Sequence, residues 1–406
     1  MTRTHHLTLL ALGCAALALA GAGSSAAQAP TTPPDASFTF HGRGWGHGVG
    51  LSQYGARGRS LAGWDAARIL KHYYQGTRLT VVKRRGLRVL LSPRRTSAAV
   101  TSATPWRAIG ARPNGRRIMR LRPGVTYRLR TLRDGRVALQ RGARTVAVFT
   151  GAPRLQPTGR DGAISWGPRR PLSARTYRGG LRAVPDGRGF ALVNLVGMED
   201  YLKGVVPREM PASWGDDAYS ALVAQAVAAR SYALATMKPT STYDVFDDTR
   251  SQVYGGRSGE DPRTSRAVEA TRGTVLTYDG EVITAFFFST SGGRTEAVQN
   301  VFRGSGPTPY LVSVPDPFDR RSPYHRWPDP PTFTGARLGR LLGLDGPVRD
   351  VAVLRRGASP RVLEASVTTA SGRQATFSGT SLRASLGLRD TWFSVTRDAT
   401  ALPAGR

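Results

Sequence analysis

Apolar and polar residues alternate along residues 79–186. Segments such as Leu87–Leu91 and Val146–Phe149 place apolar side chains at alternate positions, which is the spacing of a half-buried strand. Turn residues such as Asp134-Gly135 separate these segments, as hairpins require. The pattern predicts an inserted antiparallel β-rich domain over 80–173. Its arginines would leave one face basic, which suits either a binding surface for an anionic partner or an ordinary solvated face; they are Arg128, Arg130, Arg133 and Arg136.

A helical spacing begins at Asp216, where small and apolar residues recur every three or four positions. The residues that set this spacing are Ala218, Leu222, Ala226, Ala229 and Ala233. Asp216 and Asp217 would stand at the positive end of this long Ala-rich helix. We expect a shorter helix over 59–79, stopped by Gly76, and a buried strand over 282–288. Together these elements predict an α+β fold: a mixed core with the long helix, plus the β-rich insert.

Two prolines bracket Glu209 just before the long helix. Pro207 and Pro211 each fix φ and remove a donor, so we expect the helices on either side to end here and Glu209 to lie on a stiff turn. Met210 and Trp214 beside it would partly desolvate the carboxyl group and raise its pKa toward the range of a general acid. The alternative is an ordinary solvated loop carboxylate.

Three polar residues of the long helix are candidates for binding substrate. Gln225 falls on the buried side, where an amide must be hydrogen-bonded, so it bonds either another loop or a ligand. Arg230 and Tyr232 follow one or two turns later. The alternative is an Ala-rich core helix with one satisfied polar residue.

Two small-residue segments outside the helices complete the candidate site. Six glycines between positions 42 and 55 allow close backbone approach, so we expect a tightly packed loop that presents His47, Gln53 and Tyr54. His47 is either a structural hydrogen-bonding residue or a metal ligand, although no His or Cys lies at ligand spacing around it. At the end of the strand over 282–288, small hydroxyls could bond a sugar; they are Ser289, Thr290 and Ser291. A serine nucleophile is the rival there, but the nucleophile-elbow spacing is absent.

Several segments resemble one known family. They are EDYLKGVVP at 199–207, EMP at 209–211, AQAVAAR at 224–230 and GWGHGVGLSQYGA at 44–56. The chain resembles the stage II sporulation protein D family, also called the amidase-enhancer family. The resemblance implies a catalytic core over 174–396, on which the loop and helix of 38–79 pack. In many members the glycine-rich signature follows the Glu-Met-Pro segment, whereas here it precedes it by about 150 residues, so the N-terminal loop must fold back on the later core.

The resemblance also implies a function. It implies a lytic transglycosylase that cleaves the bond between N-acetylmuramic acid and N-acetylglucosamine in peptidoglycan to a 1,6-anhydro end, with Glu209 as acid and base. Relatives prefer glycan stripped of stem peptides. The first alternative is a noncatalytic wall-binding protein that enhances an N-acetylmuramoyl-L-alanine amidase, and the second is a secreted structural protein with an inert cleft.

One loop departs from the family pattern. Many relatives carry two cysteines, and sometimes a histidine, around an Asp-Thr pair, and some of these bind zinc. The matching positions here hold Phe246, Arg250 and Ser251. Because phenylalanine cannot bind a metal, we expect no metal site and no cofactor. Nearby Asp247, Asp248 and Gln252 either support the site by hydrogen bonds or form a plain turn.

The N-terminus and the charge suggest where the protein acts. Residues 1–29 read as a secretory signal peptide and 30–37 as a linker, so we expect a secreted or wall-associated protein. Cys14 lies inside the apolar run, and a lipoprotein anchor is disfavoured. A formal net charge of +31 favours an anionic wall polymer as a partner, unless the arginines only reflect a GC-rich genome. Export and the lack of a nucleic-acid module disfavour nucleic acid.

Overall fold

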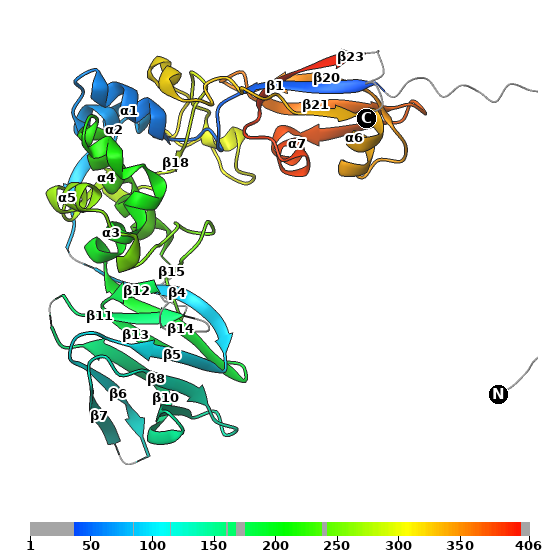
Figure 1. Cartoon of the computed structure of the whole chain (residues 1–406). Coiled ribbons are helices and arrows are strands. Elements are labelled where there is room, and N and C mark those ends of the chain that lie inside the picture. The colour runs from blue at the N-terminus through cyan, green and yellow to red at the C-terminus, as the bar shows by residue number, and fades with distance from the viewer. Residues whose placement is uncertain are drawn as a thin grey trace, which may run out of the picture.

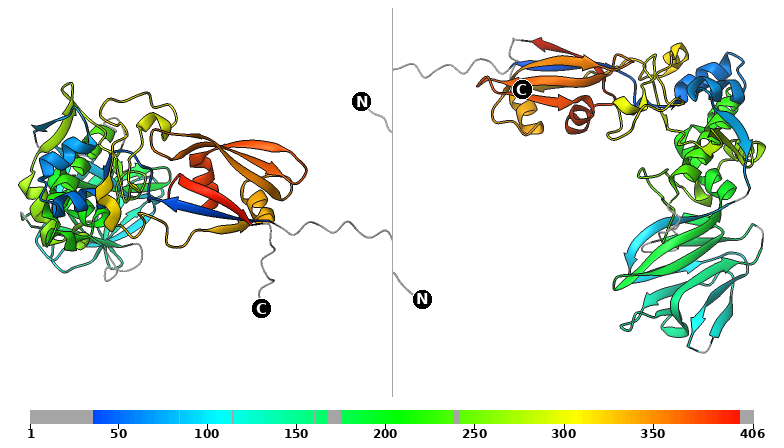
Figure 2. Two further views of the ribbon diagram at one scale, coloured as in Figure 1. Left: turned by 90° about the horizontal axis from the view of Figure 1, so that it is seen from above. Right: turned by 180° about the vertical axis from the view of Figure 1, so that it is seen from behind.

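The computed structural model describes residues 36–398 except 84, 114, 160, 168–174 and 238–241. The expected signal peptide and nearly all of the linker lie outside the described residues. Figures 1 and 2 show three regions in succession along a bent molecule: a β region, a central helical region and a second β region. This mixture of helices and sheets confirms the predicted α+β class. No helix in the described part of the chain is both long and apolar enough to cross a membrane.

The first β region is one curled sheet of 12 strands. Its strands are β4 (Gly86–Arg95), β5 (Ser97–Thr101), β6 (Trp106–Arg112), β7 (Gly115–Leu121), β8 (Tyr127–Thr131), β9 (Val137–Arg141), β10 (Arg144–Pro157), β11 (Ala163–Gly167), β12 (Arg175–Arg178), β13 (Gly180–Asp186), β14 (Gly189–Gly197) and β15 (Val245–Phe246). The hairpin partners pair antiparallel, as the alternating pattern predicts, and β15 joins β4 in parallel. Strands β12 to β14 belong to this sheet although their residues follow position 173.

The central region holds the helices and three short pairings. Its elements are α1 (Gln53–Leu61), α2 (Ala66–Tyr73), α3 (Met198–Glu209), α4 (Tyr219–Thr236), α5 (Pro262–Ala270), β2 (Leu51–Ser52), β3 (Arg78–Val81), β16 (Thr274–Tyr278), β17 (Glu281–Val282) and β18 (Phe287–Phe288). Helix α4 is buried nearly all round, because its alanines contribute to two apolar clusters on opposite sides. It is the central helix of the fold.

Two expected elements have different boundaries. The single helix expected over 59–79 is two helices, because Gly63 has φ +81° and Asp65 caps α2 by accepting a bond from the Arg68 N–H at 2.7 Å. The buried strand expected over 282–288 is only β17 and β18. Between them the Phe286 carbonyl accepts bonds from the Leu51 N–H and the Tyr74 hydroxyl instead of joining a ladder.

The turn around Glu209 also differs from its prediction. Pro207 lies inside α3, which continues to Glu209, and only Pro211 ends the helix. A proline restricts the residue before it, and Met210 is accordingly extended at φ −123° and ψ 141°. Helix α4 begins at Tyr219 rather than Asp216. Asp216 and Asp217 instead pair with arginines of other segments, Arg263 and Arg57.

The second β region joins both ends of the described chain. Its elements are β1 (Ser37–Arg43), β19 (Thr332–Thr334), α6 (Gly335–Leu341), β20 (Val348–Arg356), β21 (Val362–Thr369), β22 (Gln374–Ser378), α7 (Gly379–Leu386) and β23 (Trp392–Asp398). Strand β1 lies between β19 and β23, antiparallel to both. Residues that follow it pair with the central region, since β2 runs parallel to β18. The N-terminal loop therefore does fold back on the later core.

A buried ion pair ties the central helices together. The Arg230 Nη2 on α4 lies 2.5 Å from the Glu199 Oε2 in the first turn of α3. The same guanidinium donates to the carbonyls of Val268 on α5 and Thr274 on β16. The other carboxylate oxygen of Glu199 accepts a bond from the Gly273 N–H. One cation therefore fixes α3, α4, α5 and β16 relative to one another.

Replacing Arg230 with Met should cost about 3–5 kcal/mol of unfolding free energy, because Glu199 would stay buried without its cation. Urea unfolding followed by tryptophan fluorescence measures this. Arg355→Met, which breaks an exposed pair with Glu364, is the control and should cost at most about 1 kcal/mol. The double variant Arg230→Met with Glu199→Gln should recover part of the loss. A cost below 1 kcal/mol for Arg230→Met would contradict this role.

Candidate functional site

Glu209 is the last residue of α3, and its side chain is half-buried. Burial raises the pKa of its carboxyl group to about 7, while a hydrogen bond from the backbone N–H of Val253 offsets part of that rise. A carboxyl group with a pKa near 7 is partly protonated at neutral pH. It can therefore give up a proton and take it back under the same conditions.

A close backbone approach brings Val253 to this carboxyl group. We call residues 243–256 the site loop; it packs on α3 at Gly204. The Gly255 N–H donates to the Gly204 carbonyl, in the middle of α3, at 2.9 Å. A Cβ atom at Gly204 would lie 2.6 Å from the ring of Tyr254. Only glycine therefore lets the loop reach this depth.

Two tyrosines adjoin Glu209. Burial, and then the negative charge of Glu209, raises the pKa of both Tyr201 and Tyr232, so both phenols stay protonated at neutral pH. The Tyr201 hydroxyl donates to the Gln252 amide oxygen at 3.2 Å, and the Gln252 amide nitrogen donates to the Ala229 carbonyl at 3.3 Å. Gln252 therefore holds the site loop between α3 and α4, which is the supporting role expected for it.

Asp247 is a second half-buried carboxyl group close by. Burial raises its pKa, and the neighbouring Asp248 raises it further. Its charge also raises the pKa of Tyr201, after the contributions of Glu209 and Tyr232. Asp248 instead forms an exposed turn with Arg250, accepting from its backbone N–H at 3.0 Å. Of the two aspartates, only Asp247 borders the site.

The glycine-rich loop packs against residues that contact the site, and it does not line the site itself. The two ring nitrogens of His47 bond the Phe287 carbonyl at 3.0 Å and the Val49 N–H at 3.1 Å. Burial and the charge of Arg383 lower the pKa of His47 to about 4, so the ring is neutral and its hydrogen bonds are taken. The rings of Phe286 and Phe287 in turn contact Tyr232, with centroids 5.8 and 6.2 Å apart.

The other two residues of that loop also pack against the core. Gln53 is buried at the start of α1. The backbone N–H of Tyr54 donates to the Ser289 carbonyl at 3.0 Å, and its ring lies 5.0 Å from the ring of Trp214. Since Trp214 follows Glu209 by one short turn, Tyr54 positions the segment that leaves the carboxyl group.

Three residues expected to bind substrate belong to the core instead. Arg230 is fully buried, and its two terminal nitrogens bond Glu199 and backbone carbonyls, so its guanidinium is not accessible to a sugar. Thr290 and Ser291 are also fully buried. Their hydroxyls bond Ser322 at 2.7 Å and Asp319 at 2.9 Å. Ser289 alone of the three hydroxyls remains half-buried.

Gln225 is fully buried, and neither of its side-chain polar atoms has a hydrogen-bond partner in the described structure. Its expected partner, a loop or a ligand, is therefore not identified. With no exposed surface, its amide does not line the site around Glu209.

The site loop closes on itself where the resemblance implies cysteines in other members. The Ser251 hydroxyl accepts a bond from the Phe246 N–H at 3.1 Å, and the Arg250 guanidinium lies 3.8 Å from the centre of the Phe246 ring. Among the described residues, no group of three or more His, Cys, Asp or Glu side chains is placed to hold a metal ion.

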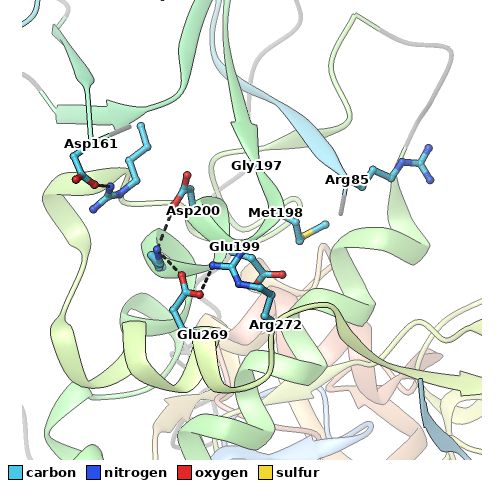
Figure 3. Close-up of a pocket in the computed structure, with 10 residues that line it drawn as sticks. Arg85, Asp161, Gly197, Met198, Glu199, Asp200, Glu269 and Arg272 are labelled. Atoms are coloured by element: carbon cyan, nitrogen blue, oxygen red, sulfur yellow. Dashed lines mark hydrogen bonds and ion pairs between the residues drawn. The ribbon is translucent and has the colours of Figure 1, made fainter. Parts of the chain in front are cut away.

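A cavity of about 510 Å³ lies at the other end of α3 (Figure 3). Its charges pair with one another: Asp161 with Arg178, and Lys203 with both Asp200 and Glu269. Ten helical residues of 1.5 Å rise separate its Glu199 from Glu209, a distance of about 15 Å. This cavity is balanced in charge and distant from the raised carboxyl group.

Sequence reasoning missed Tyr201 and the Val253 N–H. Tyr201 lies eight residues before Glu209 on α3, a helix that we expected to end before Glu209. Helical spacing does not indicate Tyr201, because eight residues of 1.5 Å rise place it about 12 Å along α3 from Glu209. The Val253 N–H carries no side-chain signal, because only the fold of the site loop brings it to the carboxyl group.

Comparison with known proteins identifies the family. The family profile described as "Stage II sporulation protein" matches residues 186–278, which include α3, the site loop and α4. The chain is 48% identical over 118 residues to the amidase enhancer of Bacillus subtilis (29% of this chain, 15% of the relative). It is 34% identical over 195 residues to the stage II sporulation protein D of the same organism (43% and 52%), and 31% identical over 245 residues to that of Bacillus amyloliquefaciens (56% and 66%).

The chain thus spans less than two thirds of the length of each of these relatives. No solved structure matches it. The matched segment nevertheless contains the Glu-Met-Pro turn, the Ala-rich helix and the site loop together. Residues 186–278 therefore contain a domain of the stage II sporulation protein D family.

Proposed function

We propose that this protein is a peptidoglycan lytic transglycosylase that acts outside the membrane, with Glu209 as its only acid and base. The observation that carries the proposal is the half-buried carboxyl group whose pKa is raised to about 7. The domain of the stage II sporulation protein D family supports a role in the cell wall. The expected signal peptide supports export.

One carboxyl group suffices for this reaction. Protonated Glu209 gives its proton to the oxygen between N-acetylmuramic acid and N-acetylglucosamine as that bond breaks. The resulting carboxylate then accepts the proton of the muramic 6-hydroxyl while the 6-oxygen bonds C1, which closes a 1,6-anhydro ring without water. A pKa near 7 suits both steps, since neither protonation state is strongly disfavoured.

The neighbours of Glu209 fit these two steps. The Val253 N–H bonds the carboxylate and so stabilises the state formed after the first proton transfer. Tyr232 remains a protonated phenol and is able to donate a hydrogen bond to a sugar oxygen. Hydrolysis would require a second carboxylate to activate water, and Asp247 is the nearby candidate for that role.

The alternative function is a noncatalytic enhancer of a cell-wall amidase. The 48% identity to the Bacillus subtilis amidase enhancer favours it, although that match covers only 29% of this chain. An enhancer would bind peptidoglycan and stimulate an amidase without releasing fragments itself. Digestion of intact and amidase-treated peptidoglycan by the purified protein separates the two functions.

Glu209→Gln should lower the release of 1,6-anhydro fragments by about 10²- to 10⁴-fold, because the amide cannot donate the acid proton. Glycan binding, measured by sedimentation with peptidoglycan, should persist. Mass spectrometry of the soluble fragments measures the product, and Glu281→Gln at an exposed strand end is the matched control.

Each other result has a defined meaning. An active Glu209→Gln variant would rule out Glu209 as the acid. Reducing ends in place of anhydro ends would indicate hydrolysis and direct attention to Asp247. Binding without release by the wild-type protein would favour the enhancer.

The pH dependence should follow the raised pKa of Glu209. The acid form is lost as pH rises through about 7, so kcat/KM should fall about tenfold per pH unit above that value.

The folding stability of the wild type should also fall as pH rises. Between pH 4.5 and 7 the folded protein holds a proton that the unfolded chain has released, so each rise in pH favours the unfolded chain. The unfolding free energy of Glu209→Gln minus that of the wild type should increase by about 1–3 kcal/mol from pH 4.5 to pH 8, as measured by urea unfolding. A gain that is equal at both pH values would contradict the raised pKa.

A further inference from the structure

A second cavity lies on the outer face of the 12-stranded sheet. We call it the arginine cavity; its volume is about 520 Å³ and its lining includes Arg116, Arg154, Arg182, Ile109 and Leu195. No acidic residue is among the described residues that line it. A bulge in β10 shapes one side, where the pairing with β6 shifts between Thr150 and Arg154. The cavity combines cationic groups with apolar surface.

The charges of the arginine cavity are not compensated by protein groups. Arg154 on β10 lies directly opposite Arg182 on β13, and like charges in that position destabilise a sheet. Burial lowers the pKa of Arg154, and the charges of Arg107, Arg182 and Arg116 lower it further. The buried Nε of Arg154 has no hydrogen-bond partner in the described structure. None of these four arginines forms an ion pair with another described residue. The cluster therefore favours binding of an anion that the protein itself does not supply.

The sheet connects this cluster to the site loop. Successive cross-strand partners run from Arg154 to Arg182, Val193, Leu90 and Phe246, and partners in register lie on the same face of a sheet. Three strand spacings of about 4.8 Å separate β13 from β15, so the backbone of Arg182 lies about 15 Å from that of Phe246 in the site loop. Phe246 belongs to the site loop, whose Val253 N–H bonds the Glu209 carboxyl group. In Figure 1, β13, β14, β4 and β15 follow one another toward the central helices.

We infer that the arginine cavity binds carboxylate groups of the same glycan strand that Glu209 cleaves, some distance from the cleaved bond. This inference rests on the proposed function. The N-acetylated sugars of peptidoglycan are neutral, and each muramic residue gains a lactyl carboxylate only where no stem peptide caps it. Arginine forks bind carboxylates in a bidentate manner. The cavity therefore selects glycan that carries free lactyl carboxylates.

Two features favour a glycan over a phosphodiester polymer as the occupant. The cavity includes Ile109, Leu195 and backbone at Gly110 and Gly151, which provide an apolar surface for the faces of sugar rings. The row of partners that ends at Phe246 also places the arginines in line with the site loop. The shared face links the arginines to a strand bound at the site loop, a link that a separate polymer lacks.

The test measures binding in the Glu209→Gln background, so that cleavage does not alter the ligand. The probes are peptide-stripped glycan strands and the same strands with their carboxylates converted to methyl amides. Arg154→Gln with Arg182→Gln should weaken binding of the stripped strands about tenfold, as expected for the loss of two partly exposed charge contacts. The strands that carry methyl amides should bind equally well to the protein with native arginines and to the double arginine variant. Arg349→Gln with Arg373→Gln, two exposed residues of the second β region, removes the same charge elsewhere and should leave binding within about twofold.

Each other outcome either overturns the inference or separates it from the proposed function. Equal losses in the two double variants would indicate only a general effect of net charge. Tighter, Arg154-dependent binding of poly(glycerol phosphate) would assign the cavity to a phosphodiester polymer. Carboxylate-dependent binding in a wild-type protein that releases no fragments would support this site while the transglycosylase proposal failed. Normal cleavage with binding unaffected by Arg154→Gln and Arg182→Gln would overturn the site alone.

Discussion

The ion pair between Arg230 and Glu199 is the constraint on which the site depends. It fixes the first turn of α3 against α4, α5 and β16. A helix is stiff over three turns, so fixing its first turn also fixes its last residue, and that residue is Glu209. The buried guanidinium of Arg230 fixes one end of α3 and thereby holds the carboxyl group of Glu209 at the other end. Arg230 therefore acts on the chemistry through position rather than through contact with substrate.

The raised pKa of Glu209 arises because separate segments close around the end of α3. The site loop reaches the carboxyl group through Gly204 and Val253, and α4 contributes Tyr232. Phe286 and Phe287 support Tyr232, and His47 in turn holds Phe287. Desolvating a carboxyl group costs stability at neutral pH. The apolar packing of α4 on both sides offsets that cost.

Sequence patterns predicted the secondary structure better than the side-chain contacts. The α+β class, the alternating strands and the general position of Glu209 followed from periodicity and from the prolines. The wrong end of α3 followed from treating Pro207 as a stop, whereas proline disturbs the helix before it and tolerates two more residues after it. Thr290, Ser291 and Arg230 were predicted to bind substrate because they are polar and lie near the expected site. Thr290 instead bonds Ser322, and Ser291 bonds Asp319. Arg230 bonds Glu199, and no pattern within one segment reveals such partners. Such partners are fixed by tertiary contacts between distant segments.

The early position of the glycine-rich loop is compatible with the site because strand pairing depends on space and not on chain order. Strand β1 lies between two strands from the far end of the chain, and β2 then meets β18 in parallel. The approach needs glycine at position 50, where φ is +77° and a Cβ atom would lie 2.1 Å from the Phe286 carbonyl oxygen. That carbonyl accepts the Leu51 N–H from the same loop. A segment that contributes backbone and packing, rather than a reacting group, can enter the fold from either end of the chain as long as these close approaches are kept.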